Sequence, residues 1–326
     1  MAIDYRKLND LCKKPKFPIP RIDATLEALV GAVWFSKIDL VRGYYQVEIE
    51  EEDKDKTAFK FDGNLFEFNR LPFGLASAPQ TFQRLMNRVV ANIPSARCYL
   101  DDIVIFSQTE EEHIQDVEKV LQALDQAGLG IKSNKCIFGT REIEFLGFKV
   151  SNGQIAPTEE KLTAMRNYPR PTSIREVERF IGLVGFYRRL IPDFAQLAAP
   201  LQQGGKTLNW TDQCETSFQS LRQRMLDRPV VHLPDFSKPF IVKTDASDNG
   251  MGAVLQQDHE DQRVVIEYAS KTFNKTQERY ATIEKEATAL MWALNKWEHY
   301  LLGGEFELET DHRPLEWHET DFSGQI

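Results

Sequence analysis

The segment Tyr99–Phe106 reads YLDDIVIF and is the most informative part of this sequence. Two adjacent carboxylates, Asp101 and Asp102, separate one apolar stretch from the next. This pattern predicts a β-hairpin in which Cys98–Leu100 enters the turn and Ile103–Phe106 leaves it. Two like charges side by side raise the pKa of at least one carboxyl group unless a cation joins them, and a divalent metal ion is the obvious cation.

A third carboxylate lies upstream, where Asp39 occurs in the strand-like stretch Phe35–Leu40 (FSKIDL). Three carboxylates on two strands can hold a pair of Mg²⁺ ions about 3.5–4 Å apart, the arrangement that polymerases use for in-line phosphoryl transfer. An isolated Asp-Asp pair is more often a turn with solvated side chains, so this interpretation needs support from the rest of the chain.

That support comes from further motifs along the chain. They are Asp4–Asn9 (DYRKLN), Phe35–Ile49 (FSKIDLVRGYYQVEI), Thr57–Phe59 (TAF), Leu71–Phe82 (LPFGLASAPQTF), Tyr99–Ser107 (YLDDIVIFS) and Phe145–Phe148 (FLGF). In their order and spacing these segments resemble the reverse transcriptases of long-terminal-repeat retrotransposons of the Ty3/gypsy type. The resemblance runs from residue 4 to about residue 317, which is nearly the whole chain.

The resemblance implies an α+β fold, a right-hand polymerase followed by a ribonuclease H-like α/β domain. We expect the palm with partial fingers at residues 1–155, the thumb and connection at 156–234, and a C-terminally truncated ribonuclease H-like domain at 235–326. The chain length agrees with this, because 326 residues with 42% hydrophobic residues can form one large or two ordinary domains.

The net charge of −9 is unfavourable for a nucleic-acid-binding protein when it is read over the whole chain. Between Lys161 and Leu190, however, seven basic residues face two acidic ones, which leaves a local charge of 7 − 2 = +5. The basic residues are Lys161, Arg166, Arg170, Arg175, Arg179, Arg188 and Arg189. A phosphate backbone can lie on such a stretch, and an ordinary solvated basic face is the alternative.

The four cysteines are far apart and the six histidines form no ligand cluster, so neither a disulfide framework nor a zinc site is predicted. The sequence has no signal peptide pattern and no apolar run that could span a bilayer, so no membrane partner is expected. A reducing compartment fits the cysteine usage. The resemblance implies a cytoplasmic location in a virus-like particle, or a nuclear one.

Two helices of the first part have clear patterns. One is predicted to begin at Ser77 in a capping-box pattern with Gln80, and the other covers about residues 111–127. In the second helix we expect the apolar face to be Ile114, Val117, Leu121 and Leu124. Further along, a hairpin is expected around Ser151–Gly153, and residues 159–227 are expected to form helices interrupted by prolines.

After Pro239 the pattern changes to strand, strand, strand, helix, strand, an order that resembles the ribonuclease H fold. Asp245 ends the first strand and Asp311 ends the last. In the helix, expected at about 280–302, Glu286 shares an apolar face with Ile283 and Leu290, where a carboxylate is costly unless it is paired or binds metal. We therefore expect Asp245, Glu286 and Asp311 to bind metal. The alternative is that Glu286 is a salt-bridge partner at the helix edge.

The resemblance assigns roles in the polymerase site. Asp39 and Asp101 would be the main metal ligands, Asp102 a weaker third, and the cofactor would be Mg²⁺ or Mn²⁺. Tyr44 would be an aromatic gate that excludes a 2′-hydroxyl on the incoming nucleotide, although a half-buried strand aromatic has the same pattern. Contacts to that nucleotide would come from Phe73 and Gly74. The primer grip would consist of Phe145, Leu146, Gly147 and Phe148.

The implied activity is RNA-directed DNA synthesis from deoxynucleoside triphosphates on a primed RNA or DNA template, with cleavage of RNA in an RNA–DNA hybrid as the second activity. Two departures weaken this interpretation. The family carries a fingers segment before the position of Asp4, and ribonucleases H normally use a fourth carboxylate on a later helix. The alternatives are a catalytically inactive remnant that binds nucleic acid, and a scaffold within a homodimer or polyprotein.

Overall fold

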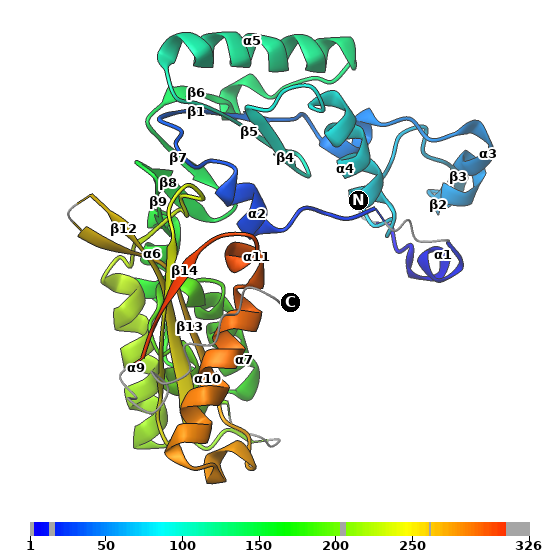
Figure 1. Ribbon diagram of the computed structural model, residues 1–326. Coiled ribbons are helices and arrows are strands. Elements are labelled where there is room, and N and C mark those ends of the chain that lie inside the picture. The colour runs from blue at the N-terminus through cyan, green and yellow to red at the C-terminus, as the bar shows by residue number, and fades with distance from the viewer. Residues whose placement is uncertain (1–2, 13–16, 203–206, 261, 311–326) are drawn as a thin grey trace. The chain divides into compact units, whose positions relative to one another are not determined.

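The computed structural model describes residues 3–12, 17–202, 207–260 and 262–310 (Figure 1). Its contacts divide the chain into two compact units. The first ends at Leu146 and includes Val150–Gly153, and the second comprises Gly147–Lys149 and begins again at Gln154. The expected division at residues 155 and 234 stays a prediction. Within the described ranges, no helix is long and apolar enough to cross a membrane.

The first unit is built on a four-stranded sheet of order β4-β5-β1-β6. Its strands are β1 Trp34–Asp39, β4 Ala96–Tyr99, β5 Asp102–Ser107 and β6 Ile137–Thr140. The predicted hairpin is confirmed, since β4 and β5 are antiparallel and Tyr99 lies opposite Asp102. Only Leu100 and Asp101 remain in the turn, and Leu100 adopts a left-handed conformation with φ of 56°. The fully buried run Ile103–Ile105 explains why this hairpin forms the centre of the unit.

Two longer helices cover this sheet. Helix α4 (Ala78–Val89) packs against β4, and α5 (Glu110–Gln126) packs against β5 and β1 (Figure 1). The expected capping box at Ser77 is wrong, because Ser77 is itself helical (φ −83°, ψ −18°) and its hydroxyl accepts no capping hydrogen bond. A capping box occurs instead at α5, between Thr109 and Glu112.

The buried face of α5 is also shifted from the expected one. Ile114 is 63% exposed, whereas His113, Val120 and Leu124 are buried. The apolar pattern therefore predicted the helix correctly but began its buried face at Ile114, whereas the structure begins it at His113. The reason is His113, a polar residue that the structure buries through hydrogen bonds.

Shorter elements complete the first unit. They are α1 Arg6–Leu11, α2 Ile22–Glu27, the 3₁₀ turn η1 Gly43–Gln46, α3 Glu51–Lys54, η2 Asp55–Thr57, the hairpin β2 Phe59–Phe61 and β3 Asn64–Phe66, η3 Ser133–Lys135, and β7 Glu142–Phe145. A chain of aromatic contacts joins this hairpin to η1, through Phe59, Phe68 and Tyr45. The side chains of Phe61 and Leu65 are 58% and 76% exposed.

The expected hairpin is confirmed: it consists of β8 Phe148–Ser151 and β9 Gln154–Pro157, in a sheet of order β10-β9-β8-β7. Asn152 and Gly153 in its turn both have positive φ, 49° and 70°, which is why an Asn-Gly pair occurs there. Helices interrupted by prolines follow as predicted: α6 Glu159–Arg166, α7 Ile174–Gly185, η4 Arg188–Leu190, α8 Phe194–Ala198, η5 Ala199–Leu201 and α9 Asp212–Leu226, then strand β10 Val231–His232.

The last described part confirms the predicted order of strands and helix. Its elements are β11 Phe240–Ala246, β12 Gly250–His259, β13 Gln262–Thr272, η6 Gln277–Arg279, α10 Thr282–Lys296, α11 Glu298–Leu301 and β14 Phe306–Glu309. The sheet order is β13-β12-β11-β14, and β14 is parallel to β11. Helix α10 covers one face of this sheet (Figure 1).

The face that α10 buries differs from the expected one. Its buried residues include Glu286, Ala289 and Ala293, and Trp297 follows at the C-cap, whereas Ile283 is 45% exposed. Small alanines suit this face, because they allow the helix backbone to approach the sheet closely. Glu286 is therefore buried as expected, although not beside Ile283.

Candidate active site

Two of the predicted carboxylates lie directly opposite each other. Asp39 at the end of β1 is the cross-strand partner of Asp102 at the start of β5, so both side chains point to the same face of the sheet. Lysines partly balance these charges: Lys37 Nζ lies 3.0 Å from Asp102 Oδ1, and Lys135 Nζ lies 4.0 Å from Asp39 Oδ2. The sequence reasoning missed both lysines, although the period-two alternation puts Lys37 on the face of Asp39.

Gln83 of α4, which is completely buried, forms hydrogen bonds to the hairpin that carries Asp101. The backbone N–H of Leu100 donates to Gln83 Oε1 at 2.7 Å, and Gln83 Nε2 donates to the carbonyl oxygen of Cys98 at 3.0 Å. Gln83 therefore ties the β4 side of the hairpin turn to α4. Sequence reasoning missed this residue too, and its only signal was a polar side chain between the apolar positions of α4.

Tyr44 lies beside the Asp101 turn. It belongs to the 3₁₀ turn η1, not to a strand, and its ring contacts Phe73 and Phe82 with centroids 5.1 and 5.4 Å away. Burial raises the pKa of Tyr44, and the negative charge of Asp101 raises it further. Next to it, a Cβ on Gly43 would lie 3.3 Å from the Asp101 Cβ and 3.0 Å from Phe82, so only glycine fits here without displacement.

The loop with the predicted nucleotide contacts has a defined shape. Gly74 has φ of 96°, a conformation that favours glycine, and Phe73 is 56% exposed. The side chain of Asn9 donates to the Gly74 carbonyl oxygen at 2.9 Å and accepts from the Ala76 N–H at 2.8 Å. Asn9, from the DYRKLN motif, therefore fixes this loop, and this is a role that the sequence did not reveal.

A separate polar cluster lies further along β1 and β5 and centres on His113, which is 3% exposed. His113 Nε2 is 2.7 Å from Ser36 Oγ, and Nδ1 is 3.0 Å from Ser107 Oγ. Ser107 donates its hydroxyl proton to Asp116, so its oxygen accepts from Nδ1–H, and Nε2 accepts from the Ser36 hydroxyl. Burial lowers the pKa of the imidazole, which favours its neutral form in this arrangement.

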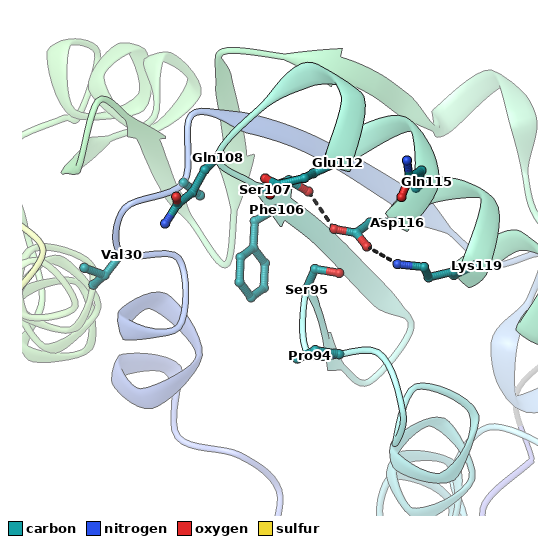
Figure 2. A pocket seen from close by; sticks show the side chains of 11 residues that line it. Val30, Pro94, Ser95, Phe106, Ser107, Gln108, Glu112, Gln115, Asp116 and Lys119 are labelled. Atoms are coloured by element: carbon teal, nitrogen blue, oxygen red, sulfur yellow. Dashed lines mark hydrogen bonds and ion pairs between the residues drawn. The ribbon is translucent and has the colours of Figure 1, made fainter.

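A cavity of about 430 Å³ lies beside this cluster (Figure 2). Figure 2 shows Asp116 bridging Ser107 and Lys119, whose Nζ lies 3.0 Å from Asp116 Oδ1. Burial alone would raise the pKa of Asp116, but hydrogen bonds from Lys119 and Ser107 help to outweigh burial and lower it. None of the predicted site residues lines this cavity.

In the second unit, Glu286 approaches the end of β11. It is 4% exposed, and its Oε1 accepts from the backbone N–H of Ala246 at 3.3 Å. Asp245 is exposed and lies opposite Gly252. It lines a cavity of about 490 Å³ together with Asp193, whose Oδ1 would be 3.4 Å from a Cβ on Gly252. The third predicted carboxylate, Asp311, lies outside the described residues.

No group of three or more His, Cys, Asp or Glu side chains within the described ranges is close enough to hold a metal ion. The donor chemistry of the first unit nevertheless suits Mg²⁺, which is commonly bound through one or two carboxylates together with substrate phosphates and water. Asp39 and Asp102 present such hard oxygen donors on one face of neighbouring strands. The metal-binding roles of the predicted residues stay predictions.

The basic segment Lys161–Leu190 is only partly available to a phosphate backbone. Arg175, Arg179 and Arg188 are exposed. Arg189, in contrast, is 8% exposed, and its Nη2 lies 3.9 Å from Oε2 of Glu267 in β13. The expected role of Arg189 on a phosphate-binding face is therefore wrong, because its guanidinium is buried in the fold.

Comparison with known proteins places this geometry in a family. Residues 1–150 match the family model of the reverse transcriptase (RNA-dependent DNA polymerase), and residues 210–308 match that of the RNase H-like domain found in reverse transcriptase. The foamy viral protease-reverse transcriptase dRH, solved in complex with double-stranded DNA, superposes with a TM-score of 0.87. It is 25% identical, and the match covers 98% of this chain and 57% of that chain.

Two curated relatives are Pol polyproteins of Drosophila melanogaster. The polyprotein from transposon 297 is 39% identical and that from transposon gypsy is 36% identical, each over 97% of this chain. The matches cover 30% and 32% of those proteins, so the chain spans about a third of the length of these relatives.

The fold and these matches define the class of protein as a reverse transcriptase with an attached RNase H-like domain. Domains of this class generally depend on divalent metal ions. Within the class, the chain is similar to Ty3/gypsy-like retrotransposon Pol polyproteins, as the resemblance predicted.

Proposed function

We propose that the first unit carries out template-directed DNA synthesis at Asp39, Asp101 and Asp102. The observation that carries this proposal is the direct pairing of Asp39 with Asp102 across β1 and β5, with Asp101 in the adjoining turn that Gln83 holds. Asp39 and Asp101, with Asp102 as a weaker third ligand, would hold Mg²⁺, or Mn²⁺, once Lys135 releases Asp39 and Lys37 releases Asp102. A divalent ion bound there would activate the primer 3′-hydroxyl and neutralise charge on the triphosphate.

The neighbouring residues would position a deoxynucleoside triphosphate. Tyr44 packs between Phe73 and Phe82 beside Asp101, so its ring is fixed and can exclude a 2′-hydroxyl by contact. Gly74, held by Asn9, permits close approach of the backbone to the nucleotide. The turn Phe145–Phe148 would hold the primer 3′ end, and the partners would be an RNA or DNA template and its primer.

The test is primer extension on a primed RNA template with Mg²⁺ or Mn²⁺. Asp101→Asn should abolish extension, because it removes a charge at the reacting centre with little change in shape. Asp125→Asn is the matched control, since Asp125 is an exposed carboxylate on α5, and it should extend normally. A folded wild-type chain that binds primer–template but never extends it would instead be a catalytically inactive remnant.

For the second unit we propose cleavage of the RNA strand in an RNA–DNA hybrid, with Asp245, Glu286 and Asp311 as the metal-binding carboxylates. The position of Glu286 supports this, because its Oε1 accepts from the backbone N–H of Ala246, the residue after Asp245, so that both carboxylates lie at the same end of β11. Action in a cytoplasmic virus-like particle or in the nucleus, and assembly as a homodimer, are part of the same proposal. Incubation of labelled hybrid with Mg²⁺ tests the cleavage.

A further inference from the structure

The turn between β7 and β8 is strained. Leu146 and Gly147 both have positive φ, 50° and 82°, which is the backbone of a tight hairpin turn that favours Asn-Gly. Leucine lacks the short polar side chain that makes a left-handed conformation tolerable. A turn of this kind persists only when its surroundings fix it, and such strain is concentrated at functional sites.

The surroundings of this turn are aromatic. Tyr187, which follows α7 and is 1% exposed, donates its hydroxyl hydrogen to the Gly147 carbonyl oxygen at 2.8 Å. Its ring packs edge-to-face on Phe148 with centroids 5.3 Å apart. Phe186 stacks on the same Phe148 ring at 5.2 Å, and a Cβ on Gly147 would lie only 3.1 Å from the Phe186 ring.

This packing holds the turn in two ways. The Phe186 ring leaves room for a glycine only, so residue 147 cannot carry a side chain without displacing the ring. The Tyr187 hydroxyl fixes the direction of the Gly147 carbonyl group, which a hairpin turn of its own would leave to solvent. A segment 40 residues away in sequence therefore sets the conformation of the turn.

We propose that Tyr187 is a positioning residue for the primer: it holds the Leu146–Gly147 turn in the conformation that receives the primer 3′ end. The inference rests on the proposed function, in which Phe145–Phe148 contact the primer. Tyr187 itself is buried, so its role is indirect. It acts through the backbone of Gly147.

The test is Tyr187→Phe, which removes the hydroxyl and keeps the ring. We expect amide hydrogen exchange of the peptide spanning residues 142–151 to rise at least fivefold, the effect of one lost hydrogen bond. The dissociation constant for primer–template, measured by fluorescence anisotropy without nucleotide, should rise about fivefold, while the KM for the nucleotide stays unchanged. Tyr300→Phe, another buried tyrosine of the second unit, is the matched control and should alter neither.

The outcomes separate this proposal from the proposed function. Unchanged exchange in Tyr187→Phe would overturn the positioning role, because the hydroxyl would then not hold the turn. Faster exchange with unchanged primer–template affinity would also overturn it, because the turn would then not receive the primer. Failure of the wild type to extend primers would defeat the proposed function alone, since exchange and affinity need no catalysis.

Discussion

Replacement of Gln83 by leucine should loosen the hairpin that carries Asp101. Leucine has a similar volume but can neither accept from the Leu100 N–H nor donate to the Cys98 carbonyl oxygen, which lie 2.7 and 3.0 Å from the Gln83 amide. A buried backbone group left without a partner costs about 1–3 kcal/mol. Water can reach the half-buried Leu100 but not the buried Cys98. We therefore expect Gln83→Leu to lower the free energy of local hairpin opening by about 2–4 kcal/mol in total.

Cys98 is a natural reporter of that opening. It is 4% exposed, and burial raises the pKa of its thiol to about 12, so it does not react while the hairpin is closed. A change of 2–4 kcal/mol corresponds to a rise of roughly 30- to 900-fold in the open population and therefore in the rate of thiol labelling. Peptide mass spectrometry separates Cys98 from the exposed Cys12 and from the other cysteines.

The matched control is Gln80→Leu on the same helix. The side-chain oxygen of Gln80 is buried with no hydrogen-bond partner among the described residues, so its loss should leave Cys98 labelling unchanged. Polymerisation should fall in Gln83→Leu and not in Gln80→Leu, because of these two glutamines Gln83 is the one hydrogen-bonded to the turn of Asp101. Labelling of Cys98 in Gln83→Leu within threefold of wild type would refute the reasoning, because Gln83 would then not be what closes the hairpin.

Three further predictions follow from the same geometry. Lys37→Met should lower the Mg²⁺ concentration for half-maximal primer extension several-fold, because the Lys37 ammonium competes with the ion for Asp102. A variant that needs more Mg²⁺ than the wild type would contradict this. Glu286→Gln should abolish cleavage of a hybrid. Glu284→Gln is the matched control: glutamine keeps an oxygen that accepts from the Ala281 N–H, so this variant should keep both cleavage and unfolding free energy. Burial lowers the pKa of His113 below its unfolded value near 6.5, so the unfolded chain binds the proton more tightly than the folded chain. The stability of the fold is therefore full above that pH and should fall as the pH drops, which amide exchange in β1 and β5 would detect as faster exchange. His113→Asn should remove this pH dependence.

Local patterns were sufficient for the elements that carry the site. The apolar run after Asp102 predicted the hairpin, and the alternation after Pro239 predicted the strands around α10, because both depend on which residues avoid water within a few positions. The same patterns placed the helix faces less well. In α10 the expected Ile283 is exposed, and in α5 the buried face includes His113, which is buried because Ser36 and Ser107 of other elements meet it.

The sequence by itself determined that this chain forms a carboxylate-bearing hairpin, a helical segment and a β-β-β-α-β domain, since hydrophobic periodicity and turn residues act over short distances. Only the tertiary structure decided what holds the carboxylates in place. Lys37 reaches Asp102, Gln83 reaches the Asp101 turn, and Arg189 is withdrawn from the basic surface towards Glu267. These contacts join residues from 17 to 78 positions apart. Their energy depends on distance, burial and hydrogen-bond geometry, which exist only once the chain has folded.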